Sequence, residues 1–288
     1  MLSNKFYLLL LKSNNYIHMK RYIVLFTILF TVVLVDAQDL KINHYTFYRD
    51  GMNPASFTQN NDVNVFVLYN NEFSGFVKQP NTQIADVSFN LRGHKLGIAV
   101  VNDIVGYDKA QNIKIRYAKQ FALSEKSFFS LGLSAGTMHR RLEATKMTFE
   151  FGDDPMSYSD YAETLLDFDF GTEFQFDRLF IGLSVTHLGK QFSNPDNSNP
   201  ISHYYAYAQY SINSNSAFRF YPNIMARAWK NTMWAEAGVQ TFYKNKVWLG
   251  LNYTVHHDMT FNTGMRVGKN IMFGYAFQSN LNAQILKP

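Results

Sequence analysis

The sequence predicts an all-β protein, a transmembrane antiparallel β-barrel of about 12–14 strands. Three observations carry this prediction: apolar and polar residues alternate in many short segments, aromatic residues make up 16%, and mean hydropathy is only −0.20 although 47% of the residues are hydrophobic. Only alternate residues of a membrane-spanning strand face lipid, and aromatic girdles mark both membrane interfaces. A helical membrane protein would be far more apolar.

The alternation is clearest over residues 165–177. One face of this segment carries Leu166, Phe168, Phe170, Thr172, Phe174 and Phe176, and the other carries Asp167, Asp169, Glu173, Gln175 and Asp177. Successive side chains of a strand point to opposite faces. We therefore expect a lipid-facing apolar side and a polar side that faces the lumen.

The same period of two recurs along the chain and predicts about thirteen strands. A fourteenth, near 142–150, is left open. The expected strands lie near 61–70, 85–91, 95–101, 113–117, 127–137, 165–177, 178–188, 203–213, 218–229, 232–243, 246–255, 261–268 and 271–278. A soluble sandwich is the alternative fold, and it explains neither the strand lengths nor the aromatic content.

The N-terminus predicts export. Met19-Lys20-Arg21 is a short basic region, the run from Tyr22 to Val35 is almost wholly apolar, and Val35 and Ala37 stand at positions −3 and −1 of a cut before Gln38. This is the build of a secretory signal peptide. We expect residues 1–37 to be the signal peptide, with Met19 as an alternative start, 38–60 an N-terminal segment, and 61–288 the barrel. An uncleaved anchor is the alternative.

Composition excludes several kinds of site. The chain has no cysteine, so it forms no disulfide and no thiolate metal site. Removing the four cations and one anion of residues 1–37 leaves 23 basic and 21 acidic residues, which is no signal for nucleic-acid binding. No phosphate-binding loop, serine elbow or zinc-protease motif is present. The sequence predicts neither an enzyme nor a cofactor.

Three groups of polar residues each have a chemical and a structural interpretation. Asp167, Asp169 and Glu173 resemble a catalytic carboxylate row, but lumen-facing acids usually pair with cations, here Lys114, Arg116 or Arg266. His256-His257-Asp258 resembles a metal cluster, but adjacent histidines of a strand point to opposite faces and chelate poorly together. His139-Arg140-Arg141 closes a strand, and a ligand role there is the lesser alternative. We expect no metal site.

Asn53-Pro54 precedes the first strand. Proline disfavours helix at the residue before it, so the dipeptide predicts a turn. The 38–60 segment is expected to plug the lumen or to lie at its periplasmic mouth. An ordinary lead-in to the first strand is the alternative.

Several motifs, taken in order, resemble the PorP/SprF family over roughly residues 38–278. These are Gln38-Asp39, Tyr45 with Met52-Asn53-Pro54-Ala55, Leu96-Gly97-Ile98-Ala99-Val100-Val101-Asn102-Asp103 with Gly106, Ser130-Leu131-Gly132-Leu133-Ser134-Ala135-Gly136, Ile181-Gly182-Leu183-Ser184-Val185 and Gly274-Tyr275-Ala276-Phe277. Asn53, Pro54, Asn102, Asp103 and Gly106 are the motif residues that we single out as structural or partner-binding.

The resemblance implies a non-enzymatic protein of the bacterial outer membrane. Members of the family belong to the type IX secretion system and to gliding motility, and assist the secretion or surface attachment of cargo adhesins. The implied partners are such an adhesin and periplasmic components of the secretion system. A channel or transporter for small solutes is the alternative, and a membrane-embedded hydrolase is a third, for which no nucleophile and base are found.

The C-terminus departs from the family. Members continue past the Gly-Tyr-Ala-Phe strand into a final strand with terminal aromatic residues, whereas this sequence ends at Gln284-Ile285-Leu286-Lys287-Pro288. We expect Phe273, Tyr275 and Phe277 to mark the last regular strand, with a loop or a frayed half-strand from Ser279. Closure would then pair that strand with the first strand directly, or remain imperfect.

Overall fold

The structure, a computed structural model, describes residues 45–57, 62–72, 78–147, 160–189, 201–213 and 217–281. The predicted signal peptide with its cleavage site, the turn-rich loop 193–200 and the tail beyond Leu281 lie outside these residues. The account below concerns the larger of two compact units, residues 38–230 and 234–288. No helix in the described ranges is long and apolar enough to cross a membrane.

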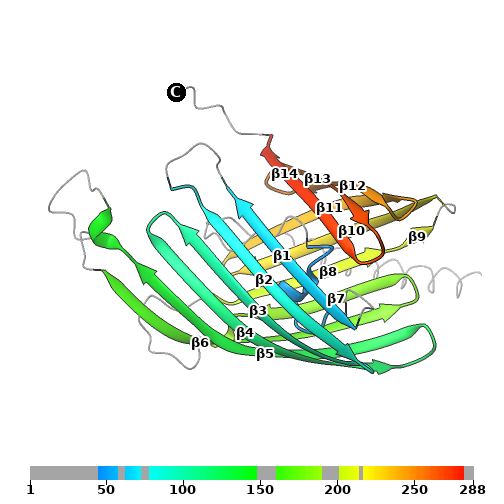
Figure 1. Ribbon diagram of the computed structural model, residues 1–288, viewed down its shortest axis with the longest axis horizontal. Coiled ribbons are helices and arrows are strands. Elements are labelled where there is room, and N and C mark those ends of the chain that lie inside the picture. Colours follow the sequence, from blue (N-terminus) through cyan, green and yellow to red (C-terminus); the bar gives the residue numbers. More distant parts are fainter. Residues whose placement is uncertain are drawn as a thin grey trace, which may run out of the picture. The chain divides into compact units, whose positions relative to one another are not determined.

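The described residues form one antiparallel sheet of fourteen strands, as the sequence predicts (Figure 1). The strands are β1 (Val63–Asn71), β2 (Asn81–Leu91), β3 (His94–Val105), β4 (Asp108–Ala122), β5 (Ser127–Leu142), β6 (Tyr161–Phe176), β7 (Leu179–Thr186), β8 (His203–Tyr210), β9 (Ile212–Asn213), β10 (Phe218–Trp229), β11 (Thr232–Tyr243), β12 (Val247–Thr254), β13 (Asp258–Val267) and β14 (Ile271–Asn280). Two 3-10 turns, η1 (Arg49–Gly51) and η2 (Ala144–Lys146), accompany them.

Each strand pairs with the next one along the chain, apart from the short β9, which pairs with β10 beside the main path. The connections therefore alternate between two ends of the sheet. At one end they are mostly tight, as at 92–93, 177–178 and 244–246, whereas the other end holds the long connections 143–160 and 187–202. Outer-membrane barrels combine short periplasmic turns with longer extracellular loops.

The tight turns need a left-handed backbone. Gly93 and Gly268 have φ of +78° and +64°, and the non-glycine residues Arg92 and Asp177 have φ of +47° and +49°. Two-residue hairpin turns with positive φ match the right-handed twist of the strands that they join. These turns hold neighbouring strands in register.

The predicted faces of residues 165–177 are confirmed in β6. Leu166 and Phe170 are 52% and 41% exposed, whereas Asp167 and Glu173 are 0% and 3% exposed. The longest ladder of the sheet joins this strand to β5, from Ser127 opposite Phe176 to Leu142 opposite Tyr161. Apolar side chains therefore line the outer face, and charged side chains line the inner face.

Three details differ from the sequence-based expectation. The open fourteenth strand near 142–150 is wrong for the part that is described, because Glu143 donates its backbone N–H to Tyr107 and the chain then turns through η2. The fourteenth strand is instead β9, since the expected strand 203–213 breaks at Ser211. The last strand continues through Ser279 to Asn280.

Candidate functional site

The inner face of the sheet carries an N-terminal segment, residues 45–57, which is held almost entirely out of solvent. Tyr45, Tyr48, Met52 and Ala55 of this segment are between 0% and 4% exposed. In Figure 1 it is the blue chain that lies among the strands. The segment contributes no strand, so side chains and the strands' own polar groups must satisfy its backbone.

A pair of glycines forms the seat of Asn53, Pro54 and Ala55. Gly132 of β5 and Gly171 of β6 lie directly opposite each other in the ladder. A Cβ atom at Gly132 would collide with the backbone of Pro54 and Ala55, and one at Gly171 would collide with the Asn53 side chain. The segment can therefore approach the sheet this closely only because neither position bears a side chain.

Asn53 fixes the turn above this seat. Its Oδ1 accepts a hydrogen bond from the backbone N–H of Ala55 at 2.9 Å, and its Nδ2 donates to the carbonyl of Thr172 at 2.9 Å and to the hydroxyl of Tyr207 at 3.1 Å. An asparagine that bonds the backbone two residues onward mimics a backbone turn. The turn expected from Asn53-Pro54 is thus joined to β6 and β8.

Glu173 binds the segment from β6. It accepts hydrogen bonds from Nε of Arg49 at 3.1 Å, from the hydroxyl of Tyr207 at 2.6 Å and from the backbone N–H of Phe57 at 3.1 Å. Arg49 and Glu173 are 3% exposed each. Removing one partner of a buried ion pair typically costs about 3–5 kcal/mol, because the other charge is left uncompensated.

Asp50 forms a second ionic contact, with β3 and β4. Its carboxylate lies 2.5 Å from Nζ of Lys95, which also donates to the carbonyl of Ser56 at 2.6 Å. Arg116 lies 4.0 Å from Asp50 and 2.6 Å from Asp86 of β2. Asp86 in turn accepts from the hydroxyl of Tyr48 at 2.6 Å.

Burial raises the pKa of the Tyr48 hydroxyl well above its ordinary value, and the Asp86 charge adds to this, so the hydroxyl stays protonated as a donor. Burial would also raise the pKa of Asp50, but the charges of Lys95 and Arg116 outweigh it and lower that pKa below its usual range. Asp50 is therefore ionised at neutral pH.

Acidification should release the segment. A carboxyl group whose pKa is lower in the folded protein than in the unfolded chain stabilises the folded state at any pH above its pKa in the unfolded chain. This stabilisation is lost as the pH falls through the pKa that the group has in the folded protein. We expect the segment to stay seated from neutral pH to about pH 4 and to detach below that, because the unfolded pKa of Asp is about 3.9. The fluorescence of a dye on Phe57→Cys, in this cysteine-free chain, measures the release.

Asp50→Asn provides the control for this titration. It removes one of the acids that titrate in that range and leaves the charges of Arg49, Lys95 and Arg116 in place. The variant should show weaker seating at neutral pH and a smaller acid-dependent change. An unaltered acid transition in Asp50→Asn would contradict the role assigned to this carboxylate.

The segment also reaches the far strands of the sheet. Thr46 accepts a hydrogen bond from Gln240 of β11, Tyr45 donates to Asn223 of β10, and the Phe47 ring lies 4.9 Å from that of Trp248 in β12. One stretch of thirteen residues therefore contacts strands from β2 to β12. The segment therefore packs against the inner face across most of the sheet.

The predicted acidic row pairs with basic side chains. Asp167 and Asp169 lie 2.9 and 2.7 Å from Nζ of Lys114, as expected, and the His187 ring lies 2.9 Å from Asp167. Glu173 pairs with Arg49, which the sequence analysis missed because the two are 124 positions apart. The described residues hold no group of three or more His, Cys, Asp or Glu side chains able to bind a metal ion.

The remaining predicted residues lie elsewhere. Asn102 and Asp103 stand near the end of β3, where Asp103 accepts a hydrogen bond from Thr82 at 2.5 Å, and Gly106 takes the left-handed position, φ +64°, of the next turn. The described hydrogen bonds do not join them to Asn53 or Pro54.

The predicted histidine and arginine groups lie in other parts of the sheet. His257 lies in the β12–β13 turn with φ +64°, and its ring is 2.7 Å from the Tyr253 hydroxyl. Arg140 pairs with Asp108 at 2.5 Å.

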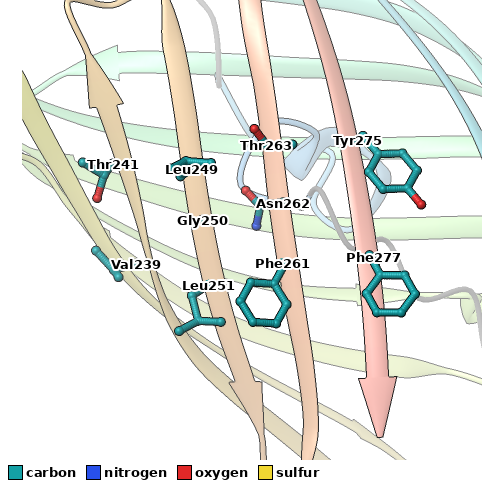
Figure 2. A pocket seen from close by; sticks show the side chains of 10 residues that line it. All are labelled: Val239, Thr241, Leu249, Gly250, Leu251, Phe261, Asn262, Thr263, Tyr275 and Phe277. Atoms are coloured by element: carbon teal, nitrogen blue, oxygen red, sulfur yellow. The ribbon is translucent and has the colours of Figure 1, made fainter.

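An apolar hollow of about 500 Å3 lies over β11 to β14 (Figure 2). Most of its lining comes from the outer face: Val239, Leu249, Leu251, Phe261, Tyr275 and Phe277. Gly250 and Asn262 also line it. It opens on the face that the apolar side chains cover, so it is a lipid-side depression rather than a site in the lumen.

An antiparallel sheet with an apolar outer face, and an N-terminal segment packed against its charged inner face, is the arrangement of a β-stranded membrane protein. The family model for the type IX secretion system membrane protein PorP/SprF matches residues 34–287. The chain belongs to this family, as its motifs indicate. No curated protein matches it.

Proposed function

We propose that this chain acts without catalysis in the outer membrane, where it assists the type IX secretion system in secreting cargo adhesins or attaching them to the cell surface. Membership of the PorP/SprF family supports a role in that secretion system. A binding role is favoured over solute transport by the N-terminal segment, residues 45–57, which contacts strands from β2 to β12. A lumen occupied in this way favours a scaffold over a solute pore.

The two ends of the sheet would serve different partners. The long connections 143–160 and 187–202 would face outward and contact the cargo, and the tight turns would contact periplasmic components of the secretion or gliding machinery. Asn102, Asp103 and Gly106 belong to the outer end in this orientation. Asn53 and Pro54 would act within the lumen by holding the segment.

Site-directed photo-cross-linking in cells tests this assignment. A cross-linker at Lys230, which is exposed at the outer end, should capture a secreted adhesin, and one at Asn245, exposed in a tight turn, should capture a periplasmic component. A cross-linker at Leu249, 69% exposed on the outer face, is the control and should capture neither. Identical products from all three positions would contradict the proposal.

Planar-bilayer recordings test the channel alternative. The purified protein should show no steady solute-sized conductance, because the N-terminal segment fills the lumen side. A large, constant conductance that persists with the segment present would favour the channel instead.

Loss of the gene tests the proposed role in cells. It should leave adhesins inside the cell or release them from its surface.

Export should remove residues 1–37. The protein extracted from the outer membrane should begin at Gln38, because Val35 and Ala37 provide the small-residue cleavage site. N-terminal sequencing, or mass spectrometry if the terminal glutamine cyclises, measures this. A mature chain that starts at Met1 or Met19 would defeat the export assignment.

A further inference from the structure

Exposed lysine and arginine side chains stand in or beside every connection at the short-turn end of the sheet. These connections join β2 to β3, β4 to β5, β6 to β7, β8 to β10, β11 to β12 and β13 to β14, so they follow one another along that end. In this order they carry Arg92, Lys126, Arg178, Arg219, Lys244 and Lys269. The exposed acids of that end, among the described residues, are Asp62, Glu125 and Asp177. The short-turn end is therefore basic.

The two ends of the sheet differ in how their charges are paired. Among the described residues, the exposed cations of the short-turn end form one ion pair, between Arg178 and Asp177 at 3.9 Å. At the opposite end Arg140 pairs with Asp108 at 2.5 Å, and Glu143 lies within 3.6 Å of three further cations. The positive charge of the short-turn end is therefore available to an anionic ligand.

The cations of the short-turn end lie at the border of the apolar outer face. Tyr243 is 41% exposed on that face, and Nζ of the adjacent Lys244 lies 5.3 Å from the centre of its ring. Phe176, which is 57% exposed, stands two positions before Arg178. One extended residue spans at most about 3.6 Å, so the backbone of each of these cations lies within about 7 Å of its aromatic neighbour. Aromatic girdles mark the level of the lipid headgroups, and the tight turns keep the cations there.

One polar cluster faces outward at the same border. Lys119 of β4 and its ladder partner His94 of β3 alternate onto the outer face, as does Tyr117, which is 44% exposed. Nε2 of His94 accepts a hydrogen bond from Nζ of Lys119 at 2.7 Å, and Nδ1 of the ring lies 2.7 Å from the Tyr117 hydroxyl. The ammonium group has three donors, so two of them remain for an anion outside the protein.

We propose that the short-turn end of this protein is a binding surface for the phosphate groups of anionic phospholipids. Headgroups fit this surface better than an acidic protein does, because the cations follow the border of the apolar face over six neighbouring turns and do not form one projecting patch. In the orientation proposed above, these lipids belong to the periplasmic leaflet. The inference goes beyond the secretion role, since it requires only that the strands cross a bilayer.

Spin-labelled lipids measure this preference in reconstituted membranes. The full chain is inserted into phosphatidylcholine vesicles, and electron paramagnetic resonance compares the association of spin-labelled phosphatidylglycerol with that of spin-labelled phosphatidylcholine. We expect phosphatidylglycerol to associate about fivefold more strongly, which is the effect of one cation near a membrane surface. Equal association of the two lipids would overturn the proposal. So would loss of the preference on adding inorganic phosphate at constant ionic strength, because the site would then be one for a free anion.

Two matched variants separate this surface from net charge. The test variant combines Lys119→Gln, Lys126→Gln and Lys244→Gln. The control combines the same change at three exposed lysines of the opposite end, Lys78, Lys146 and Lys230. The test variant should lower the preference about twofold, and the control should not, although both lose the same charge. Arginine at the three test positions should keep the preference. An unchanged preference in the test variant, or an equal loss in the control, would contradict the proposal.

The depth of the turns tests the choice of lipid over an acidic protein. A dye on Asn245→Cys, in the β11–β12 turn of this cysteine-free chain, should be quenched more by a lipid with a nitroxide on its headgroup than by one with a mid-chain nitroxide. A dye on Leu249→Cys, on the apolar outer face, should show the reverse order. Weak quenching of the Asn245→Cys dye by both lipids would place the turn in water. The basic end would then suit an acidic protein, and the proposal would be wrong.

Discussion

Gly132→Leu should drive the N-terminal segment off the inner face of the sheet. The new side chain would meet the backbone of Pro54 and Ala55, which cannot move aside as a flexible side chain can. Overpacking of this kind costs about 1–3 kcal/mol, which corresponds to a roughly 5- to 150-fold larger population of the released segment. Trypsin cleavage after Arg49 should accelerate by the same factor, since proteolysis tracks the open population.

Ala135→Leu is the matched control. It places the same side chain on the same strand but on the outer, exposed face. It should leave cleavage after Arg49 unchanged. Should Gly132→Leu fail to insert into the membrane, Asn53→Ala tests the same seat by removing the hydrogen bonds to Thr172 and Tyr207. Unchanged protection in both variants would show that the segment does not depend on this seat.

The released segment should also change conduction. If residues 45–57 close the lumen, Gly132→Leu should show transient or steady ionic currents that the wild-type protein lacks, and Ala135→Leu should not. Currents of equal size in all three proteins would mean that the segment is not the barrier. This outcome would favour the solute-channel alternative over a scaffold for secretion.

Phe170→Arg should strongly destabilise the protein in lipid. Phe170 is 41% exposed on the outer face, and its ladder partners are Leu133 and Val185, so it lies well inside the sheet. A charge on the lipid face near the bilayer midplane costs about 2–4 kcal/mol. Unfolding titrations of the refolded protein in lipid vesicles measure this free energy.

Two control variants separate the effect of depth in the membrane from that of side-chain size: Phe176→Arg moves the charge along the strand, and Phe170→Leu changes only the apolar side chain. Phe176 ends β6 at the short-turn end and is 57% exposed. The same charge there should cost only about 0–1 kcal/mol, because the cost falls toward the interface. Phe170→Leu keeps the position apolar and should be mild. Equal destabilisation by both arginine variants would refute the lipid-facing assignment of β6.

Asp169, on the opposite face of β6 from Phe170, is a buried partner of Lys114. Asp169 is 7% exposed and lies 2.7 Å from Lys114, and it also accepts from the backbone N–H of His187 at 3.0 Å. Asp169→Asn therefore weakens a buried ionic contact and should also destabilise the protein. The loss of stability in Asp169→Asn measures the strength of these contacts, and it does not test which face of β6 meets lipid.

The sequence by itself determined the fold class and the facing of the strands. The period of two in residues 165–177 separates Phe170 from Asp169 without any knowledge of neighbours, because side-chain alternation is a local property of an extended backbone. The same local signals located the thirteen strands of the main path. They located Asn53-Pro54 as a turn because proline restricts the residue before it.

Only the tertiary structure decided what the inner face holds. The pairing of Arg49 with Glu173, and the glycine seat made by Gly132 and Gly171, join residues that are far apart in the chain. No local pattern specifies such contacts, since each depends on how many residues every intervening strand and turn contains. For the same reason the direction of β1 and β14, which run parallel to each other and are unpaired in the described residues, emerged only with the strand order, where the short β9 leaves the main path and makes the number of reversals even.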